Sequence, residues 1–210
     1  MIQKFIDSIF PDKLAGMCKT EKGTLLQGLL VMLVGLVIVH AIMLAGQLAS
    51  NPFAMSVLTL TLISNAASII ISLVVLLVLH ALLFFISTRV FKGTGTLDQQ
   101  FYMASLPYVM MQIISAILDI PVLFFPNLIC VFGIIGLVVA LYGLYLLYIV
   151  VKNVHGLSST DAAISIFLTI VILVVVYFVV AFILVMLALG SILALAGSGA
   201  TGISNALVGI

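Results

Sequence analysis

Two histidines inside long apolar runs are the residues of this 210-residue chain best suited to chemistry. An ionisable side chain in a run of membrane length is a candidate for proton transfer or ligand binding, which makes His40 and His80 candidate intramembrane sites. At 1.5 Å per residue, His40 lies about 27 Å from the level of Lys22. By the same measure His80 lies only about 14 Å from the level of Arg89. We therefore expect different depths, and neutral rings bonded to nearby carbonyl or hydroxyl groups are the alternative to a shared site.

The segment Lys92-Gly93-Thr94-Gly95-Thr96 is a second candidate, because glycine-rich loops can cradle phosphate. A phosphate-binding loop needs the full GxxxxGK[ST] spacing after a strand, and this segment lacks it. We therefore expect a tight turn at the membrane surface. The chain also lacks a Ser/His/Asp or Cys/His arrangement, a cluster of carboxylates, and Cys or acidic residues at ligand spacing from His40 or His80. The sequence predicts no catalytic, metal or cofactor site.

Long apolar runs must position these residues. The chain is 65% hydrophobic and 6% charged, whereas soluble domains carry about 25% charged residues. A helix needs about 20 apolar residues to cross a bilayer. The sequence predicts an all-α polytopic membrane protein, a bundle of five transmembrane helices. The predicted spans are 25–49, a run starting between 54 and 66 and ending near 87, 103–118, 127–151, and 162 to about 189 or 196. The predicted parts are 1–24 (interfacial), 25–196 (transmembrane) and 197–210 (glycine-rich tail).

Every Lys and Arg falls in alternate gaps between these runs. The seven cations are Lys4, Lys13, Lys19, Lys22, Arg89, Lys92 and Lys152. By the positive-inside rule, this predicts a cytoplasmic N-terminus and an external C-terminus. It also puts Cys18 and Cys130 on opposite sides, so they are not expected to pair. The net charge of +1 gives no reason to expect a nucleic-acid partner.

The N-terminal segment has the pattern of a short amphipathic interfacial helix. Apolar residues recur at helical spacing, interrupted by Pro11: Ile2, Phe5, Ile6, Ile9 and Phe10. A frayed terminus is the alternative. No secretory signal precedes the first apolar run, so this run is expected to remain as a membrane anchor.

Small residues that recur on one face of a helix, three or four residues apart, indicate where helices approach one another in lipid. Such stripes occur in three of the predicted spans: Ala41, Ala45 and Ala49; Ser64, Ser68 and Ser72; and Gly133, Gly136, Ala140 and Gly143. We expect them at helix contacts within the bundle, with dimer contacts as the alternative. Tyr142, Tyr145, Tyr148 and Lys152 line the end of the fourth span, either as interface packing or as a docking surface.

Three segments have a recognisable motif: KGTGTLDQQFYMASLP within 91–107, LYGLYLLYIVVKNVHGLSSTDA at 141–162, and Phe-Pro-Asp-Lys at 10–13. Together they resemble the Yip domain family, the Ypt/Rab-GTPase-interacting membrane proteins. The resemblance implies five spans, a cytoplasmic N-terminus, and in eukaryotes roles in vesicle traffic with prenylated Rab-type GTPases and sibling proteins. The motif residues it marks for partner binding are Lys92, Gly93, Gly95, Gln100, Pro107, Tyr145, Lys152 and Asn153.

Only about 24 residues precede the first span, which favours a prokaryotic cell-membrane protein over an ER or Golgi one. The leading hypothesis is a non-enzymatic protein of the Yip type that organises membrane or recruits partners at its cytoplasmic face. Those partners would be lipid, other membrane proteins, a small GTPase-like protein, or further copies in a homo- or hetero-oligomer. A small transporter or channel subunit is the alternative, motivated by the polar intramembrane residues His40, Gln47, Asn65, His80 and Gln112. A membrane enzyme is a third, weaker alternative.

Overall fold

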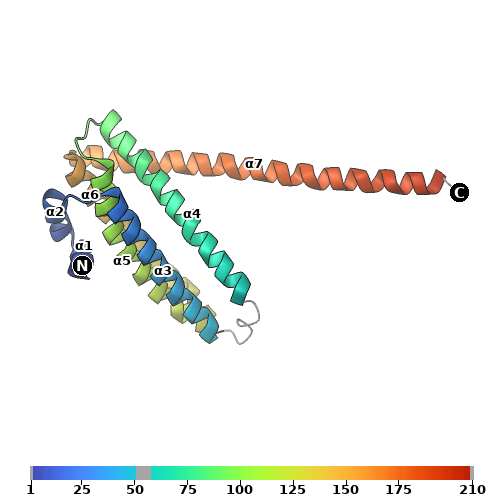
Figure 1. Cartoon of the computed structure of the whole chain (residues 1–210), viewed down its shortest axis with the longest axis horizontal. Helices are drawn as coiled ribbons and strands as arrows, with labels where there is room; N and C mark the ends of the chain where they lie inside the picture. The colour runs from blue at the N-terminus through green and yellow to red at the C-terminus, as the bar shows by residue number, and fades with distance from the viewer. Residues whose placement is uncertain (1, 51–57, 209–210) are drawn as a thin grey trace. The chain divides into compact units, whose positions relative to one another are not determined.

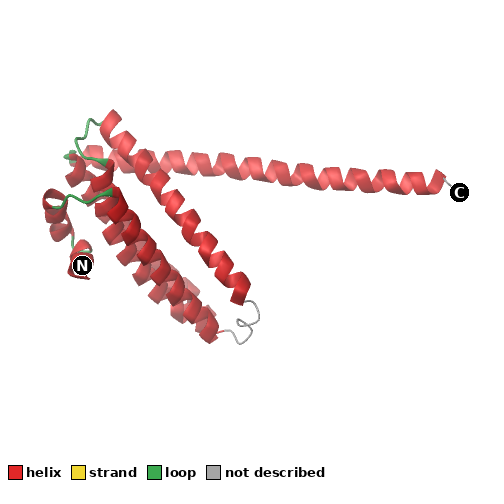
Figure 2. Cartoon of the chain, in the orientation of Figure 1, coloured by secondary structure: helices red, strands yellow, loops and turns green. Residues whose placement is uncertain are grey.

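The described part of the chain is almost entirely helical. The computed structural model describes residues 2–50 and 58–208, and no strand occurs within them (Figures 1 and 2). The elements are α1 (Ile2–Ser8), α2 (Pro11–Thr20), α3 (Leu25–Ser50), α4 (Leu58–Phe85), the π-helical turn η2 (Ile86–Val90), α5 (Leu97–Phe124), the 3-10 turn η3 (Pro126–Leu128), α6 (Ile129–His155) and α7 (Ser159–Val208). The chain divides into two compact units, 1–167 and 168–210. The second continues α7 as a single helix, and the first holds all the other elements.

Five helices within the described residues are long and apolar enough to cross a membrane. They cover Leu25–Ser50, Leu58–Val90, Leu97–Phe124, Pro126–His155 and Ser159–Ile183. The all-α polytopic prediction is thereby confirmed. The possible starts of the second span at 54–57 lie outside the described residues.

The third span is longer than the sequence predicted. Its apolar run was expected to cover 103–118, but α5 covers Leu97–Phe124. Thr96 caps the helix, since its Oγ1 accepts a hydrogen bond from the backbone N–H of Gln99 at 3.3 Å. The polar first turn thus belongs to the helix, although a hydropathy criterion excludes it.

Glycines on α3 allow close packing against α5, the most extensive helix contact in the first unit (Figure 1). A Cβ on Gly28 would lie 2.5 Å from Phe101 Cδ1, and one on Gly35 would overlap the side chain of Val109. Residue numbers rise together along the contact, from Gly28 with Phe101 to Gly35 with Val109, so α3 and α5 run parallel. They share a direction because α4, which follows α3 and precedes α5 in the sequence, runs the opposite way.

The predicted small-residue stripes do not make this contact. Ala41, Ala45 and Ala49 are exposed. A Cβ built on Gly133 or Gly136 would meet no atom within 4 Å. The prediction of helix contacts was wrong at these positions, because lipid-facing and protein-facing sides of a span are equally apolar. It holds at Gly143 of the third stripe, where a Cβ would lie 3.7 Å from Met111 Cγ of α5. Spacing alone therefore does not identify the packed side.

Candidate functional site

A buried polar network joins α4, α5 and α6 at one end of the first unit. His155, 1% exposed, places its Nε2 2.7 Å from Oε1 of the fully buried Gln100. The Gln100 amide donates from Nε2 to the backbone carbonyl of His80 at 3.1 Å. Because the Gln100 nitrogen donates to His80, the Gln100 side-chain oxygen faces His155. This oxygen only accepts hydrogen bonds, so the proton of His155 is assigned to Nε2. One glutamine thus links three helices.

Helix ends bring His155 and Gln100 together. Gln100 lies in the first turn of α5, just after the Thr96 cap. His155 is the last residue of α6, and Gly156 ends that helix in the left-handed conformation at φ 63°. Glycine adopts this backbone angle without the Cβ penalty of other residues. The N-terminal end of α5 and the C-terminal end of α6 therefore meet, and this brings the two polar side chains together.

The loop between η2 and α5 packs directly on the end of α6. The backbone N–H of Thr94 donates to the His155 carbonyl at 3.1 Å, and that of Gly93 donates to the Ser87 carbonyl at 2.9 Å. A Cβ on Gly95 would lie 2.6 Å from the Val154 oxygen and 2.8 Å from His155 Nδ1. Only a glycine at position 95 permits this approach. Residues 92–96 form a loop with no assigned turn, so the tight turn that the sequence predicted is not found here.

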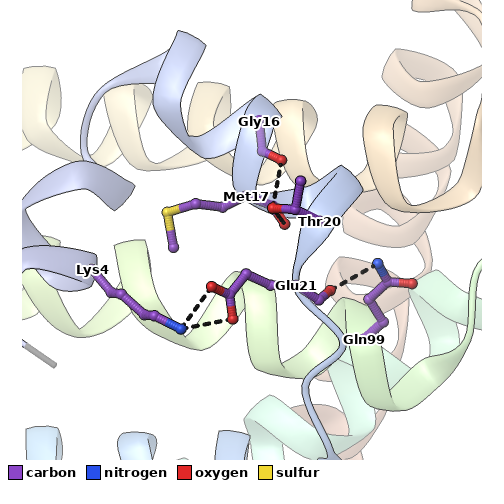
Figure 3. Close-up of polar contacts among 6 residues, drawn as sticks. All are labelled: Lys4, Gly16, Met17, Thr20, Glu21 and Gln99. Carbon is purple, nitrogen blue, oxygen red and sulfur yellow. Dashed lines mark hydrogen bonds and ion pairs between the residues drawn. The ribbon is translucent and has the colours of Figure 1, made fainter.

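The N-terminal helices are fastened to the same end. Gln99 Nε2 donates to the carbonyls of Cys18 at 2.8 Å and Glu21 at 3.3 Å. The Glu21 carboxylate accepts two 2.7 Å hydrogen bonds from Lys4, and this pairing raises the pKa of Lys4 (Figure 3). The Tyr142 hydroxyl donates to the carbonyl of Ile9 at 2.6 Å. Residues 2–20 therefore form two packed helices, the second of which begins at Pro11, and the alternative of a frayed terminus is not supported.

Cys18 lies in the core between α2, α5 and α6. It packs in a cluster with Leu14, Met103, Leu146 and Val150, and burial raises its pKa to about 12. The buried thiol is favoured in its neutral form, and the thiolate is the reactive species. Cys18 should therefore be inert while the N-terminal helices are packed.

We predict that Cys18, in a Cys130→Ser background, resists alkylation by N-ethylmaleimide between pH 7 and 9. Mass spectrometry after timed quenching measures the rate, and the same chain in denaturing detergent provides the unprotected reference. Because the folded pKa is raised, stability from the neutral thiol is present below the unfolded pKa and declines as the pH rises towards 12. Equal rates in the folded and denatured chain would contradict this packing. The exposed Cys130, in a Cys18→Ser background, is expected to react in both states.

The residues predicted from the sequence separate into two groups. The inner set packs against other parts of the protein and comprises Gly93, Gly95, Gln100 and Pro107. The outer set is exposed or half-buried and comprises Lys92, Tyr145, Lys152 and Asn153. The structure therefore brings Gly93, Gly95 and Gln100 around His155, while the other predicted motif residues lie elsewhere.

The outer set on α6 consists of aromatic and polar side chains. The ring of Tyr145 stacks on that of Tyr148 with centroids 6.1 Å apart, and Lys152 Nζ lies 6.0 Å from the Tyr148 ring centre. Lys152 also donates to Ser159 Oγ at 2.9 Å. Asn153 donates to the Ile149 carbonyl at 2.8 Å. Lys92, in the loop, is exposed at φ 58°.

Each of the two histidines named at the outset contacts a backbone carbonyl one turn before it in its own helix. Nδ1 of His40 lies 2.8 Å from the Leu36 carbonyl, and Nδ1 of His80 lies 2.8 Å from the Leu76 carbonyl. His80 reaches the network through its backbone oxygen. The residue that sequence reasoning missed is His155. Its position at a helix end, immediately before Gly156, was the available signal.

A cavity of about 430 Å³ lies between α4, α5 and α6. Its polar lining is His80, Tyr108, Gln112 and Ser115. His40, Gln47 and Asn65 do not line it. The described residues also hold no group of three or more His, Cys, Asp or Glu that could bind a metal ion.

Five membrane-length helices, with a histidine–glutamine network joining three of them, define a polytopic helical membrane protein. The chain belongs to the Yip1 domain family, whose model matches residues 7–183. That match extends from α1 to the end of the fifth membrane-length segment, and it confirms the resemblance seen in the sequence. Comparisons with curated proteins and with solved structures give no match.

Proposed function

We propose that this Yip1-family protein is a non-enzymatic membrane protein that recruits a partner at one end. That end, the cationic end, comprises residues 1–22, 89–100 and 152–161 and carries all seven Lys and Arg residues. By the positive-inside rule it is the cytoplasmic end, with the C-terminus outside. The proposal keeps residues 1–24 as an interfacial segment, 25–196 as the transmembrane part and 197–210 as a tail.

The observation that carries the proposal is the mutual fastening of the three segments. Gln99 ties α2 to α5, and the bond from Thr94 to the His155 carbonyl ties the loop to α6. A surface made of distant chain segments is preorganised when its parts are held in this way, and preorganisation lowers the cost of binding. The inner set maintains the shape, which leaves the outer set available to a partner.

The chemistry of the surface favours a protein partner that lies beside the lipid headgroups. Exposed cations near the bilayer attract anionic headgroups and acidic protein surfaces. Tyrosines 142, 145 and 148 add aromatic area of the kind enriched at protein interfaces. We propose another membrane protein, a second copy, or a small GTPase-like protein, in a trafficking-like or membrane-organising role in a prokaryotic cell membrane.

The transporter alternative has less support. It requires His40, Gln47, Asn65, His80 and Gln112 to line one wet passage. Only His80 and Gln112 share the cavity between α4, α5 and α6. Gln47 is exposed on α3, where it would face lipid or the membrane surface.

We expect a photo-crosslinking amino acid at position 92 or 153 to capture a discrete partner in native membranes. The matched control is position 127, an exposed site in the turn η3 at the other end of α6. Immunoblotting and mass spectrometry would identify adducts. Recruitment at the cationic end predicts the same partner from 92 and 153 and none from 127. Adducts from 127 alone, or lipid adducts alone at all three positions, would contradict the proposal.

A further inference from the structure

A second cavity, of about 500 Å³, lies between α1, α3 and α5. Its lining is apolar along most of its length and includes Phe5, Ile6, Leu30, Val34, Ile38 and Met110. Leu30 and Val34 are 53% and 57% exposed, so the cavity is a groove open to the surroundings of the protein. We call it the α1 groove.

The polar lining of the α1 groove is gathered near one end. Gln27 lies in the first turn of α3, and Tyr102 lies in the second turn of the parallel α5. Lys4 of α1 also lines the groove. The apolar residues of α3 and α5 follow further along the two helices. The groove therefore has one polar end and one apolar end, like a phospholipid.

The length of the groove matches one leaflet of a bilayer. From Gln27 to Ile38 the helix rises about 16 Å, close to half of the roughly 30 Å hydrocarbon thickness. Both α3 and α5 are membrane-length helices, so the groove opens at bilayer depth. Water is excluded there, and lipid chains are the apolar molecules that surround the protein.

We propose that the α1 groove binds one acyl chain of a membrane phospholipid, with the glycerol and headgroup region beside Lys4 and Gln27. The Lys4 ammonium is already paired with the Glu21 carboxylate at 2.7 Å, so this pair adds no net charge at the polar end. Recognition of the lipid therefore rests on its acyl chain and on the depth of the groove in the bilayer. Phosphatidylcholine and phosphatidylglycerol bind alike.

The test places the full chain in phosphatidylcholine nanodiscs that contain a trace of phosphatidylcholine with a mid-chain diazirine. After illumination, peptide mapping locates the adducts. The groove predicts adducts concentrated on its lining in α1 and α5, including Ile6 and Met110. Leu30→Trp, which fills the groove, should lower these adducts on the order of tenfold.

Leu33→Trp is the matched control, because Leu33 is also exposed on α3 but does not line the groove. It should leave the adduct yield unchanged, and circular dichroism of both variants verifies their folding. Adducts spread evenly over the lipid-facing surface would overturn the proposal, as would equal loss in both variants. Crosslinked dimers through α1 would show that a second copy occupies the groove and would also overturn it. A tenfold preference for a phosphatidylglycerol probe over the phosphatidylcholine probe would show that the headgroup is recognised, and it would overturn recognition through the acyl chain.

Discussion

Replacing Gln100 by leucine is expected to lower the free energy of unfolding by about 3 kcal/mol, because a buried donor and acceptor both lose their partner. The Nε2–H of His155 would lose its acceptor, and the carbonyl of His80 would lose its donor. Both groups lie in the protein interior, where water does not replace the bond. Thermal unfolding of the Cys130→Ser chain in detergent, followed with a dye that reacts with newly exposed Cys18, measures the change.

A double-mutant cycle separates this network from a general packing defect. Replacing both partners by apolar groups of similar shape leaves fewer unpaired atoms than replacing one. Gln100→Leu combined with His155→Phe should therefore cost less than the sum of the two single changes, with a coupling of at least about 1 kcal/mol. Additive losses would contradict a bond between Gln100 and His155.

Replacing Gly95 by alanine is expected to cost about 2 kcal/mol, since overpacking displaces well-fitted neighbours. The new methyl group would lie 2.6 Å from the Val154 oxygen and 2.8 Å from both Val154 Cγ1 and His155 Nδ1. For a chain of this size the loss corresponds to roughly 4–8 °C in unfolding temperature.

Gly133→Ala is the control for Gly95→Ala. A Cβ at Gly133 would meet no atom within 4 Å, and alanine favours a helix by up to about 1 kcal/mol over glycine. The unfolding temperature of this control should stay the same or rise. A fall equal to that of Gly95→Ala would show that the loop does not depend on close contact with α6.

Helices were predictable because their signal is local. The run from Leu25 to Ser50 is mostly apolar and holds no charged residue, and its length suits a bilayer crossing. Membrane length follows from such a pattern without knowledge of the neighbours. The resemblance to the Yip family rested on longer segments and was confirmed by the match to residues 7–183.

The site was less predictable because its contacts are distant in sequence. Gln100 and His155 are 55 residues apart, and neither has a periodic pattern that points to the other. The spacing argument predicted different depths for His40 and His80, and only His80 of the two lines the cavity between α4, α5 and α6. It did not reveal that Gln100 would reach the His80 backbone. The packed side of α3 was also hidden, because Gly28 and Gly35 lie seven residues apart while the wrong stripe, Ala41 to Ala49, has the expected four-residue spacing.

The central claim is that the exposed cations of the cationic end meet the partner, while the inner set only maintains the shape. Crosslinking from position 153 in an Arg89→Glu/Lys92→Glu chain tests it most directly, because both side chains are exposed and outside the His155 network. Reversing the charge at both positions is expected to repel the partner and to lower the yield of its adduct on the order of tenfold. The unfolding temperature should stay within about 2 °C, as for other surface changes. An unchanged yield from an equally stable chain would contradict the account.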